Sequence, residues 1–306
     1  MEIRRATTDD EVEALLSVHN TVHAHDRLGL TEMRSWESQV KELAMFVAWE
    51  GSRPVGAGSV ALVAQRPDPH AEGWVLNEER RRGIGSALYE TVSAQVAGWG
   101  KDQFEVPVED SDPDGEAFVT TRGFTEIGRE IRVSLDLTEV VAPEVNAPRG
   151  VTIVTWADRP ESIRGMYEVA VQAFPDIPGQ EEERVEPFED WLAHDMQAGP
   201  GDRPEATFVA LAGDEVVGYS KFSLSDAQPS VAHHDITGVK RAWRGRGVAR
   251  ALKQAQIAWA KNNGYEELRT QNEERNAPIR KLNAEFGYVP SGIRMFFRGP
   301  ISGSGS

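Results

Sequence analysis

The sequence predicts a protein of two tandem α/β domains. Its 306 residues correspond to about two domains of ordinary size. An internal repeat supports this: AMFVAWEGSRPVGAGSV from Ala44 matches ATFVALAGDEVVGYSKF from Ala206, and RRRGIGSAL from Arg80 matches RGRGVARAL from Arg244. The offsets are 206 − 44 = 162 and 244 − 80 = 164 residues, so one unit has been duplicated. Each copy mixes strand and helix patterns, which is typical of α/β folds.

The elements come in the same order in both copies. A short strand (2–6 and 151–155) leads into a helical pattern, and two strands joined by a turn follow (46–50 and 54–60; 208–212 and 215–222). A further strand ends at an arginine-glycine loop, where a long amphipathic helix begins. In the second copy Val248, Leu252, Ala255 and Trp259 recur at helical spacing. A strand (267–272), a short helix (276–286) and terminal strands complete the copy.

Domain boundaries follow from the repeat and from the segment between the copies. TEVVAPEVNAPRG, residues 138–150, carries two prolines and little periodicity. We expect a first domain over 1–140, a linker over 141–150, a second domain over 151–300 and a flexible tail, ISGSGS, over 301–306.

Composition limits the class of function. There are 49 Asp and Glu against 33 Lys and Arg, so we expect no nucleic-acid partner, because phosphate contact relies on a basic surface. The absence of Cys excludes disulfides, thiolate metal sites and a cysteine nucleophile. No apolar run approaches the ~20 residues that span a bilayer, and the N-terminus has no signal-peptide core. We expect a cytoplasmic monomer or homodimer with no membrane partner and no metal.

One segment is basic in this acidic chain: VKRAWRGRGVARALKQAQIAWAK, residues 239–261. A helix N-terminus presents unpaired N–H groups and the positive end of the helix dipole, and glycines let the backbone approach a ligand closely. The segment therefore predicts an anion site, most naturally for phosphate. The alternative is a solvated basic turn.

The pattern Arg-x-x-Gly-x-Ala or Gly stands between strand and helix in both copies. It resembles the acetyl-CoA pyrophosphate loop of the GCN5-related N-acetyltransferase (GNAT) superfamily. The later NEERNAPIRKLNAEFGY resembles that superfamily's closing segment, with Asn276 in place. The resemblance covers essentially the whole chain. It implies two GNAT-like domains, each a mixed, mostly antiparallel sheet flanked by helices. The tandem layout is also similar to that of the mycothiol synthases, without a feature specific to them.

The resemblance implies acetyl-CoA as the acetyl donor and a small-molecule amine as the acceptor. The residues expected to bind acetyl-CoA are Thr237, Val239, Lys240, Arg244, Gly245, Arg246, Gly247, Val248, Ala249, Asn272 and Asn276 in the second copy, and Val75, Arg80, Gly83 and Gly85 in the first.

In this superfamily the strand before the loop often carries the catalytic base. The second copy reads VAHHDITGV there, and counting alternate residues from Val239 puts Thr237, Asp235 and His233 on one face. A protonated amine must lose a proton before attack, and histidine has a suitable intrinsic pKa. His233 is the candidate base, and Asp235 could orient it or act through water. The alternative is a satisfied polar pair in a strand.

The first copy is expected to be degenerate. The offset of 164 places Pro69 and Ala71 where the second copy has His233 and Asp235, and neither side chain can accept a proton. Such a domain could hold acetyl-CoA without turnover or only support the second domain.

Two further segments carry alternative interpretations. His19 and His23 of HNTVHAH are spaced for one helix face, where we favour a surface or cleft role over a metal. The acidic segment over 180–196 would favour a cationic amine acceptor if it lies over the acceptor site, and is otherwise a solvated face.

The predicted activity is N-acetylation by direct transfer in a ternary complex, because there is no cysteine to carry the acetyl group. Many superfamily members have a Tyr seven residues after the Asn276 equivalent, and here that residue is Asn283. The leaving thiolate could be protonated by water, Tyr265 or Tyr288. The alternatives are a non-catalytic acetyl-CoA-binding or sensor module and an acetyltransferase like the mycothiol synthases.

Overall fold

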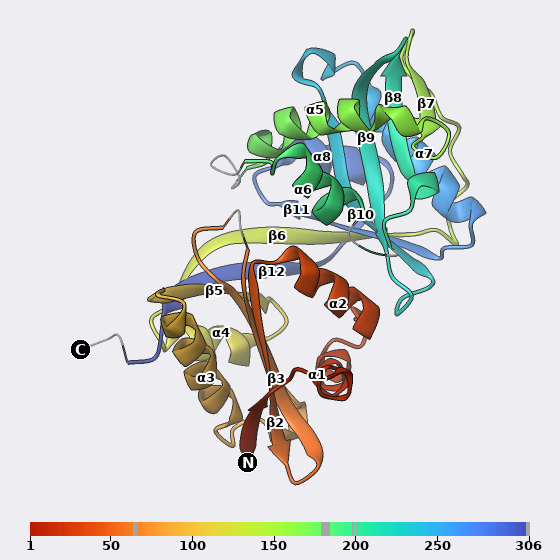
Figure 1. The fold of residues 1–306 in the computed structure, drawn as a ribbon. Helices are drawn as coiled ribbons and strands as arrows, with labels where there is room; N and C mark the ends of the chain where they lie inside the picture. The colour runs from red at the N-terminus through yellow and green to blue at the C-terminus, as the bar shows by residue number, and fades with distance from the viewer. Residues whose placement is uncertain (64–65, 179–183, 198, 200, 304–306) are drawn as a thin grey trace. The chain divides into compact units, whose positions relative to one another are not determined.

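The computed structural model describes residues 1–63, 66–178, 184–197, 199 and 201–303, and the chain divides into two compact units (Figure 1). Unit 1 comprises Met1–Arg129 and Ile293–Ser306, and unit 2 comprises Glu130–Gly292. Each unit is a mixed, mostly antiparallel sheet flanked by helices, which confirms the predicted fold class. In the described part of the chain, no helix has the length and apolar character needed to cross a membrane.

The sheet of unit 1 has the order β1-β2-β3-β4-β5-β12. β4 and β5 are parallel, and the other neighbours are antiparallel. The strands are β1 (Glu2–Arg5), β2 (Glu42–Glu50), β3 (Arg53–Leu62), β4 (His70–Val75), β5 (Gln103–Glu109) and β12 (Val289–Pro300). The helices are α1 (Asp9–Val22), α2 (Leu30–Gln39), the 3-10 turn η1 (Asn77–Glu79), α3 (Ile84–Gly98) and α4 (Pro113–Thr120).

Unit 2 repeats this plan, with the sheet order β6-β11-β10-β9-β8-β7. Among the described strands of this unit β10 and β11 are parallel, and the other paired neighbours are antiparallel. The strands are β6 (Thr125–Asp136), β7 (Thr152–Thr155), β8 (Thr207–Ala212), β9 (Glu215–Leu224), β10 (Val231–Val239) and β11 (Glu267–Glu273). The helices are α5 (Ile163–Ala173), α6 (Phe188–Trp191), α7 (Val248–Asn262) and α8 (Ala277–Glu285), with a π-helical turn η4 (Leu192–Met196) and 3-10 turns η2 (Pro160–Ser162), η3 (Phe174–Asp176), η5 (Pro204–Ala206) and η6 (Arg241–Trp243).

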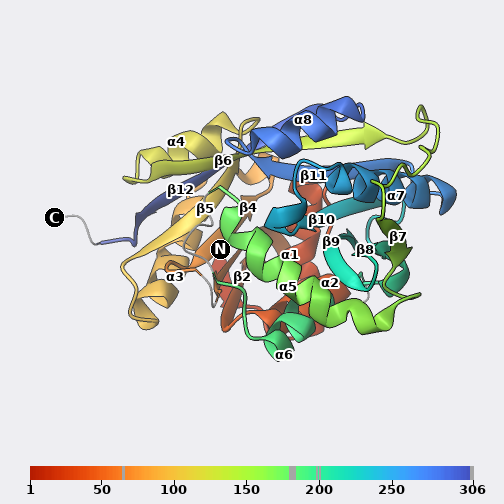
Figure 2. The ribbon, with the colours of Figure 1, turned by 90° about the horizontal axis from the view of Figure 1, so that it is seen from above.

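The two units exchange their last strands. β12 follows the second copy in sequence, yet its residues from Ile293 onward belong to unit 1 and pair with β5 (Figures 1 and 2). β6 follows the first copy, yet its residues from Glu130 onward belong to unit 2 and pair with β11. The compact units therefore differ from a contiguous division of the chain. The proposed division into functional domains at 141–150 stays a prediction.

The segments expected to be a linker and a tail contact the units. In the expected linker, the amide of Asn146 donates to Oε1 of Gln254 on α7 at 2.9 Å. In the expected tail, the amide of Ser302 donates to Oγ of Ser93 on α3 at 2.9 Å. The end of that tail, 304–306, lies outside the described residues.

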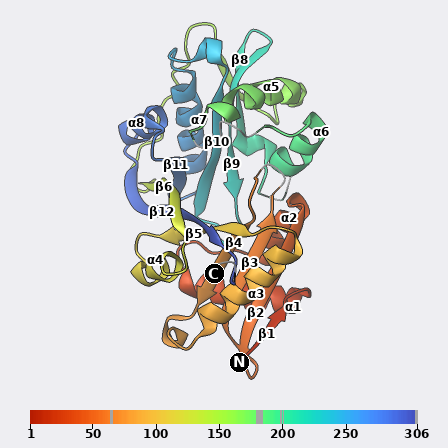
Figure 3. The same cartoon turned by 90° about the vertical axis from the view of Figure 1, so that its left-hand side faces the viewer.

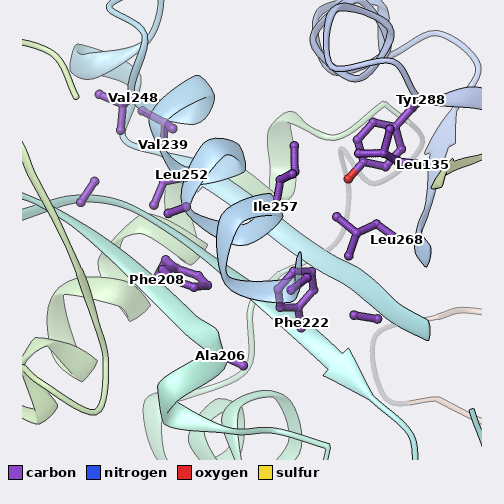
Figure 4. Packing of buried hydrophobic residues seen from close by; sticks show 14 of the residues in the cluster. Leu135, Ala206, Phe208, Phe222, Val239, Val248, Leu252, Ile257, Leu268 and Tyr288 are labelled. Atoms are coloured by element: carbon purple, nitrogen blue, oxygen red, sulfur yellow. The ribbon is translucent and has the colours of Figure 1, made fainter. Parts of the chain in front are cut away.

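Unit 2 has a separate apolar core on each face of its sheet. On one face α7 contributes Val248, Leu252 and Ile257, which pack against Phe208 and Phe222 of the strands (Figure 4). On the other face Met166 and Val169 of α5 and Trp191 of α6 pack against Val209 and Tyr219 of the strands. Figure 3 shows α7 on one side of these strands and α5 and α6 on the other. We call these the α7 face and the α5 face.

Candidate functional site

The arginine-glycine loop of unit 2 ends in an uncapped helix. Gly247 is the N-cap of α7 with φ 90°, Gly245 has φ 70°, and in the described residues no side-chain hydrogen bond caps the start of the helix. A Cβ on Gly245 would meet nothing within 4 Å, and one on Gly247 would meet only Pro148 Cγ at 3.7 Å. The sequence therefore places glycine where the backbone turns left-handed and leaves helix-start N–H groups open to an anion.

The charge around this loop is incompletely compensated. Arg241 and Arg244 both pair with the single carboxylate of Asp176, at 2.7 Å each. Hydrogen bonds from Arg241 lower the pKa of Asp176 to about 2, and those from Arg244 add to the shift. Arg246 is exposed, lies 5.0 Å from the centre of the Trp243 ring, and has no carboxylate partner among the described residues. A net positive charge thus lies beside the open amides.

Some residues predicted to bind acetyl-CoA are otherwise engaged. Lys240 is buried, and its Nζ pairs with Glu168 at 2.9 Å and Glu215 at 3.1 Å. Val248 is 1% exposed in the α7 core. Its backbone, but not its side chain, remains suitable for contact with a ligand.

Two asparagines occupy the start and the interior of α8. Asn276 is the N-cap of α8, and its side chain accepts no capping hydrogen bond. Buried Asn272 accepts a hydrogen bond at 3.0 Å from Nδ2 of Asn283, which is also buried. The side-chain nitrogen of Asn272 lacks a partner among the described residues.

The parallel strands part beside the loop. β10 pairs with β11 only at Val231, Ala232 and His233, and in the described residues this ladder ends there. β11 nevertheless continues to pair with β6 as far as Glu273. The edge of β10 that carries Thr237 and Val239 therefore lacks a strand partner on the β11 side, and such an edge can bind an extended ligand through its backbone.

A β-bulge changes the faces predicted for β10. His234 pairs with Phe222, but Thr237 pairs with Ser220, so one extra residue lies between His234 and Thr237. Paired residues share a face: His234 lies with Phe222 in the α7 core, and Gly238 pairs with Tyr219 and approaches Val169 on the α5 face.

The expectation that His233, Asp235, Thr237 and Val239 share one face is therefore wrong. Thr237 and Val239 lie on the α7 face. His233, the neighbour of His234, lies on the opposite, α5 face, and Asp235 reaches Lys221 there at 3.0 Å. The extra residue breaks the alternation on which the expectation depended.

The same bulge corrects the comparison with the first copy. In unit 1 Ala61 pairs with His70, and Ser59 pairs with Glu72. At the offset of 162, Ala61 corresponds to Ser223, which pairs with His233. Ser59 corresponds to Lys221, which forms an ion pair with Asp235. His70 and Glu72, not Pro69 and Ala71, thus occupy the equivalent places. The expectation that unit 1 lacks groups able to accept a proton there is wrong.

The histidines of unit 1 gather near this strand. His70 Nε2 lies 3.7 Å from Glu72 Oε1, and the buried His19 ring contacts Trp74 edge-on at 4.8 Å between centroids. Burial, reinforced by His19, lowers the pKa of His23. Among the described residues, no group of three or more His, Cys, Asp or Glu side chains is arranged to hold a metal ion.

The arginine-glycine loop of unit 1 is compensated by carboxylates. Arg80 pairs with Asp112 at 2.9 Å, Arg81 pairs with Asp114, and Arg82 pairs with Glu50 and Glu79. Gly83 has φ 85° and is the N-cap of α3, as Gly247 is of α7. At the place of Gly245, however, unit 1 has Arg81 with φ 63°.

Sequence reasoning missed a buried lysine on the α5 face. Lys221 is 3% exposed, and Asp195, Asp202 and Asp235 surround its ammonium group. A lone Lys within the apolar strand pattern EVVGYSKF was the available signal, because buried lysines require ionic or polar partners.

The fold and the loops define a class of tandem α/β proteins. In unit 2 of this chain the two parallel strands separate next to a helix that begins at a glycine, and the free amides of that helix start suit a phosphate-bearing ligand. The sequence pattern of the "Acetyltransferase (GNAT) family" matches residues 9–124 of this chain and matches it again over residues 163–288. The chain therefore belongs to the GNAT acetyltransferase family, in a tandem arrangement.

Known proteins are similar to this chain over most or nearly all of its length. A "Mycothiol acetyltransferase" of Catenulispora acidiphila is 25% identical over 78% of this chain and 75% of its own. The structure of a tandem GNAT protein from the clavulanic acid biosynthesis pathway covers 99% of both chains with a TM-score of 0.79 at 22% identity. A GCN5-related N-acetyltransferase from Sphaerobacter thermophilus covers 98% of this chain and 96% of its own, with a TM-score of 0.74 at 21% identity.

Proposed function

We propose that this acetyltransferase uses acetyl-CoA to acetylate a small-molecule amine, with the chemistry in unit 2. The observation that carries the proposal is the loop before α7. The loop contains two glycines in the left-handed backbone conformation, free amides at the helix start, and Arg246, which lacks a carboxylate partner in the described chain. This donor set fits a pyrophosphate group.

Residues of unit 2 have distinct proposed roles in that reaction. The amides after Gly247, with Arg244 and Arg246, would hold the phosphates, and the unpaired edge of β10 at Thr237 and Val239 would bind the extended part of the cosubstrate. Acetyl-CoA supplies the acetyl group as a thioester. His233 and Asp235, on the α5 face, are the candidate base and its partner.

The proposed reaction is a direct transfer without an acetyl-enzyme, because the chain has no cysteine. The amine nitrogen bonds to the acetyl carbon as the carbon–sulfur bond breaks. Of the two protons that an ammonium acceptor loses, one passes to the protein base and then to water, and the other ends on the thiol of CoA.

Placing the chemistry in unit 2 rests on charge, since both units carry groups able to accept a proton. The loop arginines of unit 1 are already paired with Asp112, Asp114, Glu50 and Glu79. A phosphate would have to compete with these carboxylates. In unit 2 the corresponding cations outnumber their acidic partner.

A CoA-release assay with a broad panel of primary amines tests the proposal. We expect acetyl-CoA-dependent thiol release with at least one amine, and its loss in Gly247→Val. The competing function is a non-catalytic acetyl-CoA-binding module, favoured by the buried Asn283 in place of the family's usual tyrosine. Tight acetyl-CoA binding without release for any amine would support that module.

A further inference from the structure

The α5 face of unit 2 carries three carboxylates around one ammonium group. Nζ of Lys221 on β9 lies 2.7 Å from Asp202, 3.0 Å from Asp235 and 3.6 Å from Asp195. The carboxylates come from the loop before η5, from β10 and from η4. We call Asp195, Asp202 and Asp235, with Lys221, the aspartate cluster.

Negative charge exceeds positive charge in this cluster. Burial tends to lower the pKa of Lys221, but the three carboxylates outweigh burial, and the net effect is to raise it. Burial raises the pKa of Asp195 to about 6, which Lys221 opposes and Asp235 and Asp202 reinforce. The nearby His194 is itself paired with Glu186 at 2.9 Å. One lysine therefore leaves charge available to a second cation.

A buried hydroxyl points independently to a missing partner. Tyr219 lies two residues before Lys221 on β9 and is 0% exposed, and its hydroxyl has no hydrogen-bond partner in the described residues. Burial raises the pKa of Tyr219, and the charges of Asp195 and Asp235 raise it further, so the phenol lies within the field of those carboxylates. An unsatisfied buried hydroxyl is costly and calls for a partner.

The members of the cluster differ in their exposure to solvent. The Lys221 side chain is 4% exposed and Asp202 13%, whereas Asp195 is 25% and Asp235 39% exposed. Asp235 lies in the bulge of β10, which brings it to the α5 face beside His233. A cation from solvent can therefore approach Asp195 and Asp235 without displacing Lys221.

We propose that the aspartate cluster binds the acceptor of the reaction as an ammonium ion, between Asp195 and Asp235, with the hydroxyl of Tyr219 as a further partner. This inference rests on the proposed function and restricts its substrate class to amines that arrive protonated. The site binds the cation beside His233, where the proton is then removed.

The inference predicts a pH dependence with a defined sign. Asp195 binds a cation only as a carboxylate, so ammonium affinity should rise with pH through about 6 and level off above it. Near pH 6, binding should release protons, because the bound cation favours the ionised form of Asp195. The groups that act on Asp195 are Lys221 on β9, Asp235 on β10 and Asp202 in the loop.

The test uses n-propylammonium as the probe and propan-1-ol as its uncharged counterpart, with ligand-observed NMR and calorimetry on the full chain. We expect the ammonium to bind wild type and the alcohol not to bind. Asp195→Asn and Asp235→Asn should each weaken binding by at least about tenfold. Asp214→Asn removes a charge from a fully exposed turn residue and should change nothing.

Each outcome decides the matter. Failure of wild type to bind the ammonium, equal binding of the alcohol, or unchanged binding in both cluster variants would overturn the inference and leave the cluster a structural ion network. If Asp195→Asn does not fold, the more exposed Asp235→Asn carries the decision. Acetyl-CoA titration separates the two proposals. If the wild type binds acetyl-CoA and releases CoA but does not bind the ammonium, only the proposed role of the cluster is refuted. If the wild type neither binds acetyl-CoA nor releases CoA with any amine, the proposed function is refuted.

Discussion

The two arginine-glycine loops differ in charge compensation more than in backbone. Both helices start at a left-handed glycine, Gly83 in unit 1 and Gly247 in unit 2. In unit 1 carboxylates contact all three arginines of the loop, whereas in unit 2 Arg246 has no such partner in the described chain. A duplicated motif can therefore keep its shape while its affinity for an anion is cancelled by neighbouring acids.

The largest expected difference between the units concerns the candidate bases. His233→Ala should lower kcat/KM by about 10² to 10⁴, the usual contribution of a placed base, while acetyl-CoA affinity stays near wild type. The matched change His70→Ala, at the equivalent position of unit 1, should leave turnover nearly unchanged. Steady-state kinetics across pH measures both. Equal losses would mean that unit 1 also performs the chemistry.

A smaller difference is expected from the loop arginines. Arg246→Ala should weaken acetyl-CoA binding about 10- to 100-fold, because a hydrogen bond to a charged group contributes about 1.5–3 kcal/mol. Arg82→Ala, its counterpart, should have no effect on acetyl-CoA affinity because Glu50 and Glu79 already hold Arg82. Calorimetric titration of acetyl-CoA into both variants at one salt concentration measures these affinities. A stronger effect of Arg82→Ala would reverse the assignment of the loops.

The smallest expected effect is on stability. Arg81 has φ 63°, where its counterpart Gly245 has φ 70°, and a left-handed residue with a Cβ costs about 1–2 kcal/mol. Arg81→Gly should therefore raise the free energy of unfolding of unit 1 by about 1 kcal/mol, after the entropic cost of glycine, and Gly245→Ala should lower that of unit 2 similarly. Denaturant unfolding measures both; a destabilising Arg81→Gly would show that the pair with Asp114 outweighs the strain.

The repeated fold, the loops and the helix starts were predictable because they depend on local sequence. Glycine at 247 before an amphipathic run indicates a helix start whatever surrounds it, and α7 begins at Val248. The exchange of β6 and β12 was not predictable, since a strand's own pattern is the same whichever neighbour it pairs with.

The error over His70 and Glu72 has a specific cause. The offset between the copies grows from 162 at the paired strands to 164 at the loop, so two extra residues lie between them in the second copy. One of them is the bulge in β10, between His234 and Thr237. A single offset applied across the strand therefore shifted the comparison by one residue and exchanged its faces.

The partners of Lys221 were likewise beyond sequence reasoning. Asp195 and Asp202 approach it from segments 26 and 19 residues away in the chain, and nothing local marks them among 49 acidic residues. Only the packing of η4 and its following loop against β9 brings them together.

The most direct measurement is calorimetric titration of acetyl-CoA into Gly247→Val and Gly83→Val, with circular dichroism to confirm that both variants fold. Valine is strained at the left-handed φ of either site, and its side chain would block approach to the helix-start amides. We expect Gly83→Val to bind acetyl-CoA as wild type does and Gly247→Val to lose binding. Retained binding in a folded Gly247→Val, with loss in Gly83→Val, would contradict the assignment of the acetyl-CoA site to unit 2.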